Sequence, residues 1–151
     1  MNISVFLGIV VFVACFGGVL YLNSSAGEGT KLFFVTPPYN YAVGDALSYV
    51  NAFLFVFILS AAFFGIAAPL ALGIEGLKYA SLLSTGIMPV YDILFVIPQV
   101  FAAYSAALLG RGAIEDYQGK GSVFAHWKDS VKFFVVGAVS LVILIAVRSY
   151  L

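Results

Sequence analysis

Apolar residues occupy long, uncharged stretches of this chain, and short polar stretches separate them. A transmembrane helix needs about 20 mostly apolar residues to cross the hydrocarbon core of a bilayer. The pattern therefore predicts an all-α, polytopic helical bundle in which residues 1–151 form a single transmembrane domain. About five spans are expected, at 3–22, 47–69, 71–90, 93–110 and 131–150, with loops at 23–46 and 111–130.

Residues 72–92 are the ambiguous part of this pattern, because they carry Glu75, Lys78 and Asp92 among glycines and a proline. On a helix, Glu75 and Lys78 are three positions apart and can form an ion pair. We favour a complete span with this pair near one interface, because residues 80–90 are uncharged and long enough to cross half the bilayer. The alternative is four spans plus a re-entrant or interfacial hairpin at 72–92.

Small residues within the apolar runs predict where two helices approach closely. The first run has a pair of small residues four positions apart, and the fourth run has a stripe with the same spacing. A glycine followed by Pro69 near the end of the second run predicts a kink or break there. The candidate helix-packing residues are Ala14, Gly18, Gly65, Ala102, Ala106 and Gly110.

The few charged residues predict an orientation. Lysine and arginine are enriched in cytoplasmic loops, which favours a cytoplasmic position for 111–130. We therefore expect a multi-pass protein of the cell membrane with its C-terminus outside. Arg148, at the exit of the last span, is expected to snorkel to the interface. Asn23 begins an N-x-S acceptor pattern and is a candidate glycosylation site on the loop 23–46.

Composition excludes several classes of protein. The chain is 63% hydrophobic and 9% charged, whereas an average soluble domain is about 45–50% apolar and about 25% charged. A soluble single-domain enzyme and a disordered chain are both excluded on these values. Seven basic and seven acidic residues balance to a net charge of zero, which gives no electrostatic footprint for nucleic acid. The single cysteine excludes an internal disulfide.

Catalytic chemistry is not indicated by any motif. His126 is the only histidine, and the sequence has no phosphate-binding loop or nucleophile elbow. We therefore predict no enzyme activity, no catalytic residue, no cofactor and no metal site. Polar residues inside apolar stretches are better candidates, because burying them in a membrane is costly. They would form either a polar site at broken helices or ordinary contacts between helices, and they are Asn51, Glu75, Lys78, Asp92 and Gln99.

The order of features between Asn51 and Arg148 resembles the stage II sporulation protein M family of small integral membrane proteins. The matching features are Asn51 and Gly65 in one span, Gly73-Ile-Glu-Gly76, Met88-Pro89, and a small-residue exit at Ala106 to Arg111. The family's Pro-His-Gly-Glu pattern is replaced here by Pro89-Val-Tyr-Asp92. The resemblance implies a membrane scaffold that assembles with cell-wall-degrading enzymes.

Three functional hypotheses follow. The first is a non-catalytic structural, scaffold or assembly component that acts through helix–helix association, as a homo-oligomer or with other membrane proteins. The second is a small transporter or channel with a polar site at broken helices. The third is a viral or envelope structural membrane protein. In each case the expected partners are the lipid bilayer and other membrane helices, and not nucleic acid.

Overall fold

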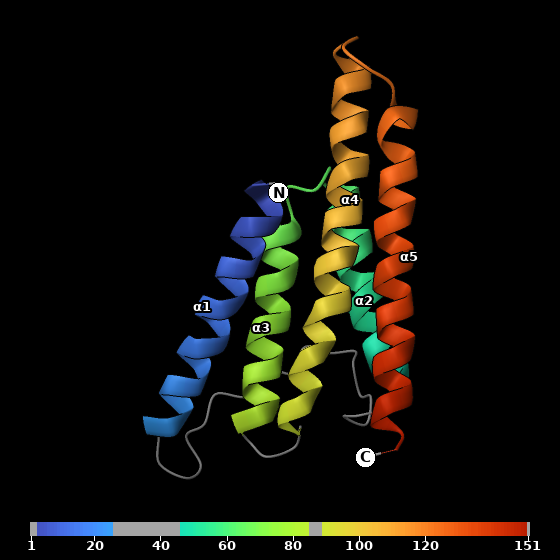
Figure 1. Ribbon diagram of the computed structural model, residues 1–151. Coiled ribbons are helices and arrows are strands. Elements are labelled where there is room, and N and C mark those ends of the chain that lie inside the picture. The colour runs from blue at the N-terminus through green and yellow to red at the C-terminus, as the bar shows by residue number, and fades with distance from the viewer. Residues whose placement is uncertain (1–2, 26–45, 85–88, 151) are drawn as a thin grey trace.

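A computed structural model describes residues 3–25, 46–84 and 89–150. These ranges are helical and contain no strand, so the predicted all-α class is confirmed (Figure 1). Most of the predicted loop 23–46, with its aromatic and proline residues, lies outside the described residues. The described helices are α1 (Ile3–Ser25), α2 (Ala46–Ala62), α3 (Ala68–Ser84), the 3-10 helix η1 (Val90–Phe95), α4 (Val96–Tyr117) and α5 (Val123–Arg148).

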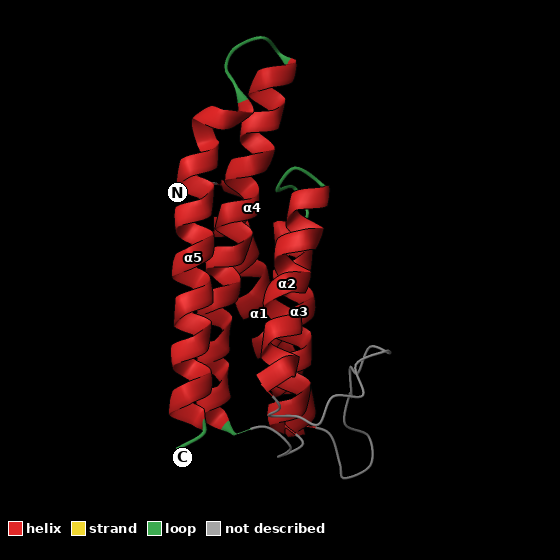
Figure 2. Ribbon diagram, turned by 90° about the vertical axis from the view of Figure 1, so that its right-hand side faces the viewer, coloured by secondary structure: helices red, strands yellow, loops and turns green. Residues whose placement is uncertain are grey.

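The helices lie side by side in an elongated bundle. α1 packs along α3, α4 packs along α5, and α2 lies against α4. In both views the connection between α4 and α5 extends beyond the turn that joins α2 and α3 (Figures 1 and 2). We call residues 111–130 the projecting hairpin. The core consists of aromatic and aliphatic side chains from every α-helix, and it includes Phe12, Phe53, Val56, Leu72 and Leu141.

Three segments among the described residues are long and apolar enough to cross a membrane. They are α1, residues 90–117 formed by η1 and α4, and α5. Their outward faces are rich in apolar side chains, such as Val13 on α1 and Val139 and Val142 on α5, which are more than half exposed. A soluble protein rarely leaves such long apolar faces uncovered, whereas the hydrocarbon of a bilayer covers them at no cost. These helices therefore belong to a membrane protein.

The break predicted at Gly65 is confirmed, and it comes earlier in the span than expected. α2 ends at Ala62, and a tight turn leads into α3 at Ala68, so the span predicted at 47–69 is too long. Gly65 has a φ of 80°, a backbone conformation that side chains with a Cβ adopt only at a cost. Its N–H donates to the carbonyl of Ser60 at 2.6 Å. The turn reverses the chain so that α3 runs back beside α2.

Helix boundaries also differ around the predicted loop 111–130, most of which is helical. α4 continues to Tyr117, and α5 begins at Val123 after the N-cap Ser122, whose side chain accepts from the N–H of Phe124 at 3.2 Å. Arg111 and Glu115 form an i,i+4 ion pair at 2.7 Å on the outer turns of α4. The apolar run ends here, but the helix continues. Ion pairs between residues i and i+4 support a helix in water.

Residues 72–84 form one continuous helix within α3, whereas the hairpin hypothesis required two half-helices over 72–92. Of the predicted span at 71–90, the described helix α3 covers the residues up to Ser84, and residues 85–88 lie outside the described residues. The following η1 turn carries Asp92 into α4. Glu75 lies near the middle of α3 and away from its ends, and the position of its ion pair near one interface stays a prediction.

The predicted small residues of α4 pack against other helices of the chain, whereas those of α1 do not. Gly110 touches the backbone of Phe64, and a Cβ at Gly65 would meet Ala107 at 2.6–2.9 Å. Ala102 and Ala106 are fully buried. Ala14 and Gly18, in contrast, lie on the exposed face of α1. α1 lies close to α3 at Gly8, where an added Cβ would collide with α3. On α3, an added Cβ at Gly73 or Gly76 would collide with α1.

Candidate functional site: two buried polar clusters

Glu75 is the centre of the first buried polar cluster. It is 3% exposed, and its Oε2 accepts from the Nζ of Lys78 at 2.9 Å. The Nε2 of Gln99 on α4 donates to the same oxygen at 3.3 Å and to the hydroxyl of Tyr79 at 3.1 Å. We call Glu75, Lys78, Tyr79 and Gln99 the Glu75 cluster. It joins α3 to α4 through polar contacts in an otherwise apolar region.

Lys78 is the exposed member of this cluster, with a side chain that is 25% exposed. Its Nζ also lies 5.6 Å from the centre of the Tyr79 ring, where the face of the ring attracts a cation. Gln99 is 1% exposed, and its Oε1 accepts no hydrogen bond among the described residues. The cluster therefore neutralises its carboxylate but leaves one buried acceptor unsatisfied.

Asp92 is the centre of the second cluster, and it is fully buried in η1. Its Oδ1 accepts from the Nε of Arg148 on α5 at 2.8 Å, and its Oδ2 accepts a short hydrogen bond from the hydroxyl of Tyr49 on α2. The Tyr49 ring stacks on Phe95 with 3.6 Å between the ring centres. We call Tyr49, Asp92 and Arg148 the Asp92 cluster. It ties three elements that are far apart in the sequence.

Arg148 turns inward instead of snorkelling, because the buried carboxylate of Asp92 attracts it. Its side chain is 23% exposed, and its guanidinium also lies 5.5 Å from the centre of the Tyr49 ring. A cavity of about 110 Å³ opens beside it, lined by Ala46, Tyr49, Ile145, Arg148 and Ser149. The Arg148 side chain thus connects α5 with Asp92 of η1 and with the Tyr49 ring of α2.

The candidate polar residues from the sequence analysis do not form one site but, apart from Asn51, are divided between the two clusters. Glu75, Lys78 and Gln99 meet in one cluster, and Asp92 belongs to the other. Asn51 is half-buried on α2 and belongs to neither.

The geometry does not favour glycosylation at Asn23. This residue lies on α1, is 2% exposed, and donates through Nδ2 to the Oγ of Ser84 at 2.7 Å. A glycan needs an accessible side chain, whereas this amide links α1 to the end of α3.

Sequence reasoning missed the roles of Tyr49, Tyr79 and Arg148, and it missed a buried serine pair. The hydroxyls of Ser105 on α4 and Ser130 on α5 lie 2.9 Å apart, and each serine side chain also donates to the other's backbone carbonyl. The sequence feature that could have indicated the role of Arg148 was Asp92, because a carboxylate in an apolar segment requires a cation as its partner. The sequence alone offered several basic residues for that role.

The projecting hairpin holds a separate, more exposed ion network. Glu115 on α4 accepts from Arg111 and lies 2.8 Å from the Nε2 of His126 on α5. The network fixes the ends of α4 and α5 to each other.

The arrangement is suited to joining helices. Each buried carboxylate already has a cation and a further hydrogen-bond donor from the same chain, as a buried charge requires. No group of three or more histidine, cysteine, aspartate or glutamate side chains that could hold a metal occurs in the described part of the chain.

The fold and these clusters define the class: a helical membrane protein whose buried carboxylates are paired with cations of the same bundle. No family model, curated protein or solved structure matches the chain. The resemblance to the stage II sporulation protein M family therefore stays a prediction.

Proposed function

We propose that this chain is a five-span integral membrane protein that serves as a non-catalytic scaffold and assembles through helix–helix contacts. α2 and α3 supply the two shorter spans, since 17 residues at about 1.5 Å each give about 25 Å of helix. The projecting hairpin faces the cytoplasm under the positive-inside rule, which puts the C-terminus outside. In this arrangement the paired clusters hold the bundle together.

The uncovered face of α1 is the observation that carries the proposal. Ala14 and Gly18 are exposed on it, and a Cβ added at Gly18 would meet no atom within 4 Å. Small residues four positions apart let a second helix approach closely in a membrane, where dispersion contacts drive association. The same chain uses glycines in this way between α1 and α3. A second copy is the partner that the exposed face of α1 fits.

Replacing Gly18 by leucine is expected to reduce self-association at least tenfold, because the larger side chain keeps a second α1 at a distance. The dimer fraction is measured by cross-linking and by energy transfer between labelled chains in liposomes at several protein-to-lipid ratios. The matched control is Val142→Leu on the exposed face of α5, which should leave the dimer fraction unchanged. A wild-type chain that stays monomeric at every ratio would contradict the proposal.

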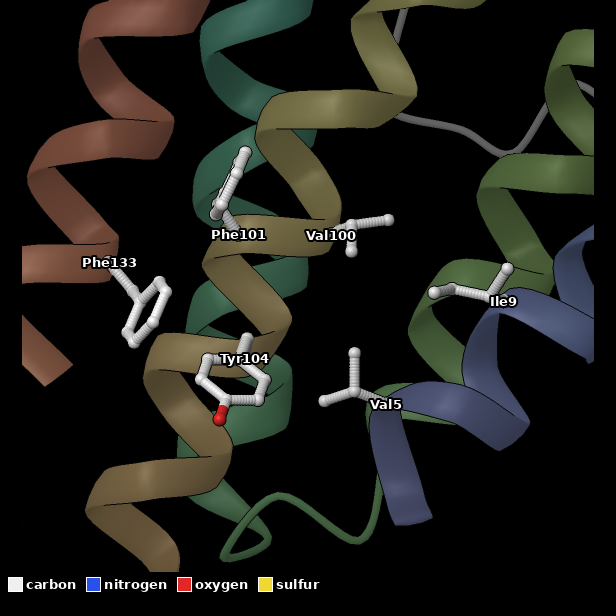
Figure 3. A pocket seen from close by; sticks show the side chains of 6 residues that line it. All are labelled: Val5, Ile9, Val100, Phe101, Tyr104 and Phe133. Atoms are coloured by element: carbon white, nitrogen blue, oxygen red, sulfur yellow. The ribbon is translucent and has the colours of Figure 1, made fainter. Parts of the chain in front are cut away.

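A transporter or channel is the second candidate function, and the Glu75 cluster favours it. An ion pair and an unsatisfied buried amide oxygen lie together near the middle of α3. Transport sites in helical membrane proteins are often built from such groups at mid-membrane. Neither the cavity beside Arg148 nor the groove in Figure 3 is lined by Glu75 or Gln99. The scaffold proposal therefore comes first.

Liposomes that contain the protein are expected to release protons and small ions no faster than protein-free liposomes. The reason is that the Glu75 carboxylate is already occupied by Lys78 and Gln99. Dye-loaded vesicles report the flux. A wild-type flux that Glu75→Gln and Lys78→Met both abolish, and that Asp116→Asn does not, would replace the scaffold proposal by the transporter.

A further inference from the structure

An apolar groove of about 300 Å³ runs between α1 and the α4–α5 pair (Figure 3). α1 packs mainly on α3 and has few contacts with α4, so the described residues leave this space open. The walls are lined by Val5, Ile9, Val100, Phe101, Tyr104 and Phe133. A volume of about 300 Å³ is within the range of ligand pockets, so the groove is large enough to take a ligand.

Among the described residues that line this groove, Tyr104 alone brings a polar side-chain atom. Its ring packs edge-on against Phe133, with 4.6 Å between the ring centres. Its hydroxyl makes no hydrogen bond to any described residue and lies at the end of the groove near Val5 (Figure 3). That end lies at the level of the α2–α3 turn, because the neighbouring Ser4 donates to the carbonyl of Gly65 in this turn. The groove is therefore apolar along its length and polar at its outer end.

We propose that this groove binds one acyl chain of a membrane phospholipid, with the Tyr104 hydroxyl donating to an ester carbonyl of the same lipid. The polarity of the groove matches such a molecule, since the ester oxygens of a phospholipid lie at the edge of the hydrocarbon and its chain runs inward. Tyrosine is enriched at this depth because its ring is apolar and its hydroxyl is polar. The site is independent of self-association through the exposed face of α1.

The polarity of the lining argues for an acyl chain as the occupant. The lining is apolar along the groove, and the Tyr104 hydroxyl is the polar side-chain atom among the lining residues. An acyl chain is narrow and flexible enough to lie between the side chains of Ile9 and Val100, and each buried methylene adds to its affinity.

The experiment is a titration of the full-length protein in detergent micelles with phosphatidylcholine, read by native mass spectrometry. Wild-type protein is expected to bind one lipid saturably. Val100→Trp fills the groove and should weaken this binding at least tenfold. Val139→Trp makes the same change on the exposed face of α5 and should bind as wild type. Tyr104→Phe removes only the hydroxyl and should weaken binding about two- to tenfold.

Three outcomes would overturn the proposal. They are non-saturable binding to the wild type, equal binding to Val100→Trp and Val139→Trp, and loss of dimer without loss of lipid in the groove variants. The last outcome would assign the groove to a second copy. Ile9→Phe fills the groove from α1 and replaces Val100→Trp if circular dichroism shows that the latter has lost helix.

Discussion

Replacement of Asp92 by alanine is expected to destabilise the folded protein by about 3–5 kcal/mol, the largest effect of any single substitution of a polar residue in this chain. The change leaves the guanidinium of Arg148 without its carboxylate and the hydroxyl of Tyr49 without its acceptor. Tyr49 is buried, and a buried donor that loses its acceptor is costly, as is the loss of one partner of a buried ion pair. The free energy of unfolding is measured by titration with sodium dodecyl sulfate in mixed micelles.

Two comparisons isolate the role of the buried charge. Asp116→Ala removes an exposed carboxylate in the projecting hairpin and should leave the free energy of unfolding unchanged. Asp92→Leu combined with Arg148→Met removes both charges and should recover part of the loss, since a buried pair contributes little beyond cancelling its own desolvation. If Asp92→Ala and Asp116→Ala have equal effects, the Asp92 cluster does not stabilise the fold.

Replacement of Gly110 by alanine is expected to destabilise the protein by about 3 kcal/mol, at the upper end of the usual cost of overpacking. A Cβ at this position would lie 2.2 Å from the carbonyl carbon of Phe64 and 2.3 Å from its oxygen. Backbone atoms cannot move aside as the end of a side chain can, so α4 must shift away from the α2–α3 turn. Thermal unfolding in detergent measures the effect.

Gly17→Ala is the matched control for this prediction. It makes the same chemical change inside a helix, but a Cβ at Gly17 would meet no atom within 4 Å. Alanine is the better helix former by about 1 kcal/mol, so this variant should be neutral or slightly more stable. A loss of stability in both variants to the same degree would show that helix packing at Gly110 is not the cause.

The sequence could predict the class of the fold because the bilayer requires long apolar helices. It also predicted the break at Gly65, where a glycine and a following proline disfavour a continued helix. Its error at 111–130 has a physical cause: polarity marks where a helix leaves the apolar environment, and the helix itself continues through Arg111 and Glu115. Hydropathy detects where a helix leaves the apolar environment, but it does not detect where the helix ends.

The sequence could predict which residues form the polar site, but it could not predict which of them pair with one another. Glu75 and Lys78 are neighbours on one helix, so their pairing follows from spacing alone. Gln99 reaches the same carboxylate from α4, which depends on how α3 and α4 are placed. Asp92 had several cations available in the sequence, and the packing of η1 against α5 selects Arg148 among them.

By itself the sequence determined that this chain is helical, apolar and without a recognisable catalytic motif, because these properties follow from local composition and periodicity. Only the tertiary structure decided which small residues pack inside the bundle and which face outward. Ala14 and Gly18 have the same spacing as Ala102 and Ala106, yet the first pair is exposed and the second is buried. Spacing defines a face of a helix, and the neighbouring helices decide whether that face is covered.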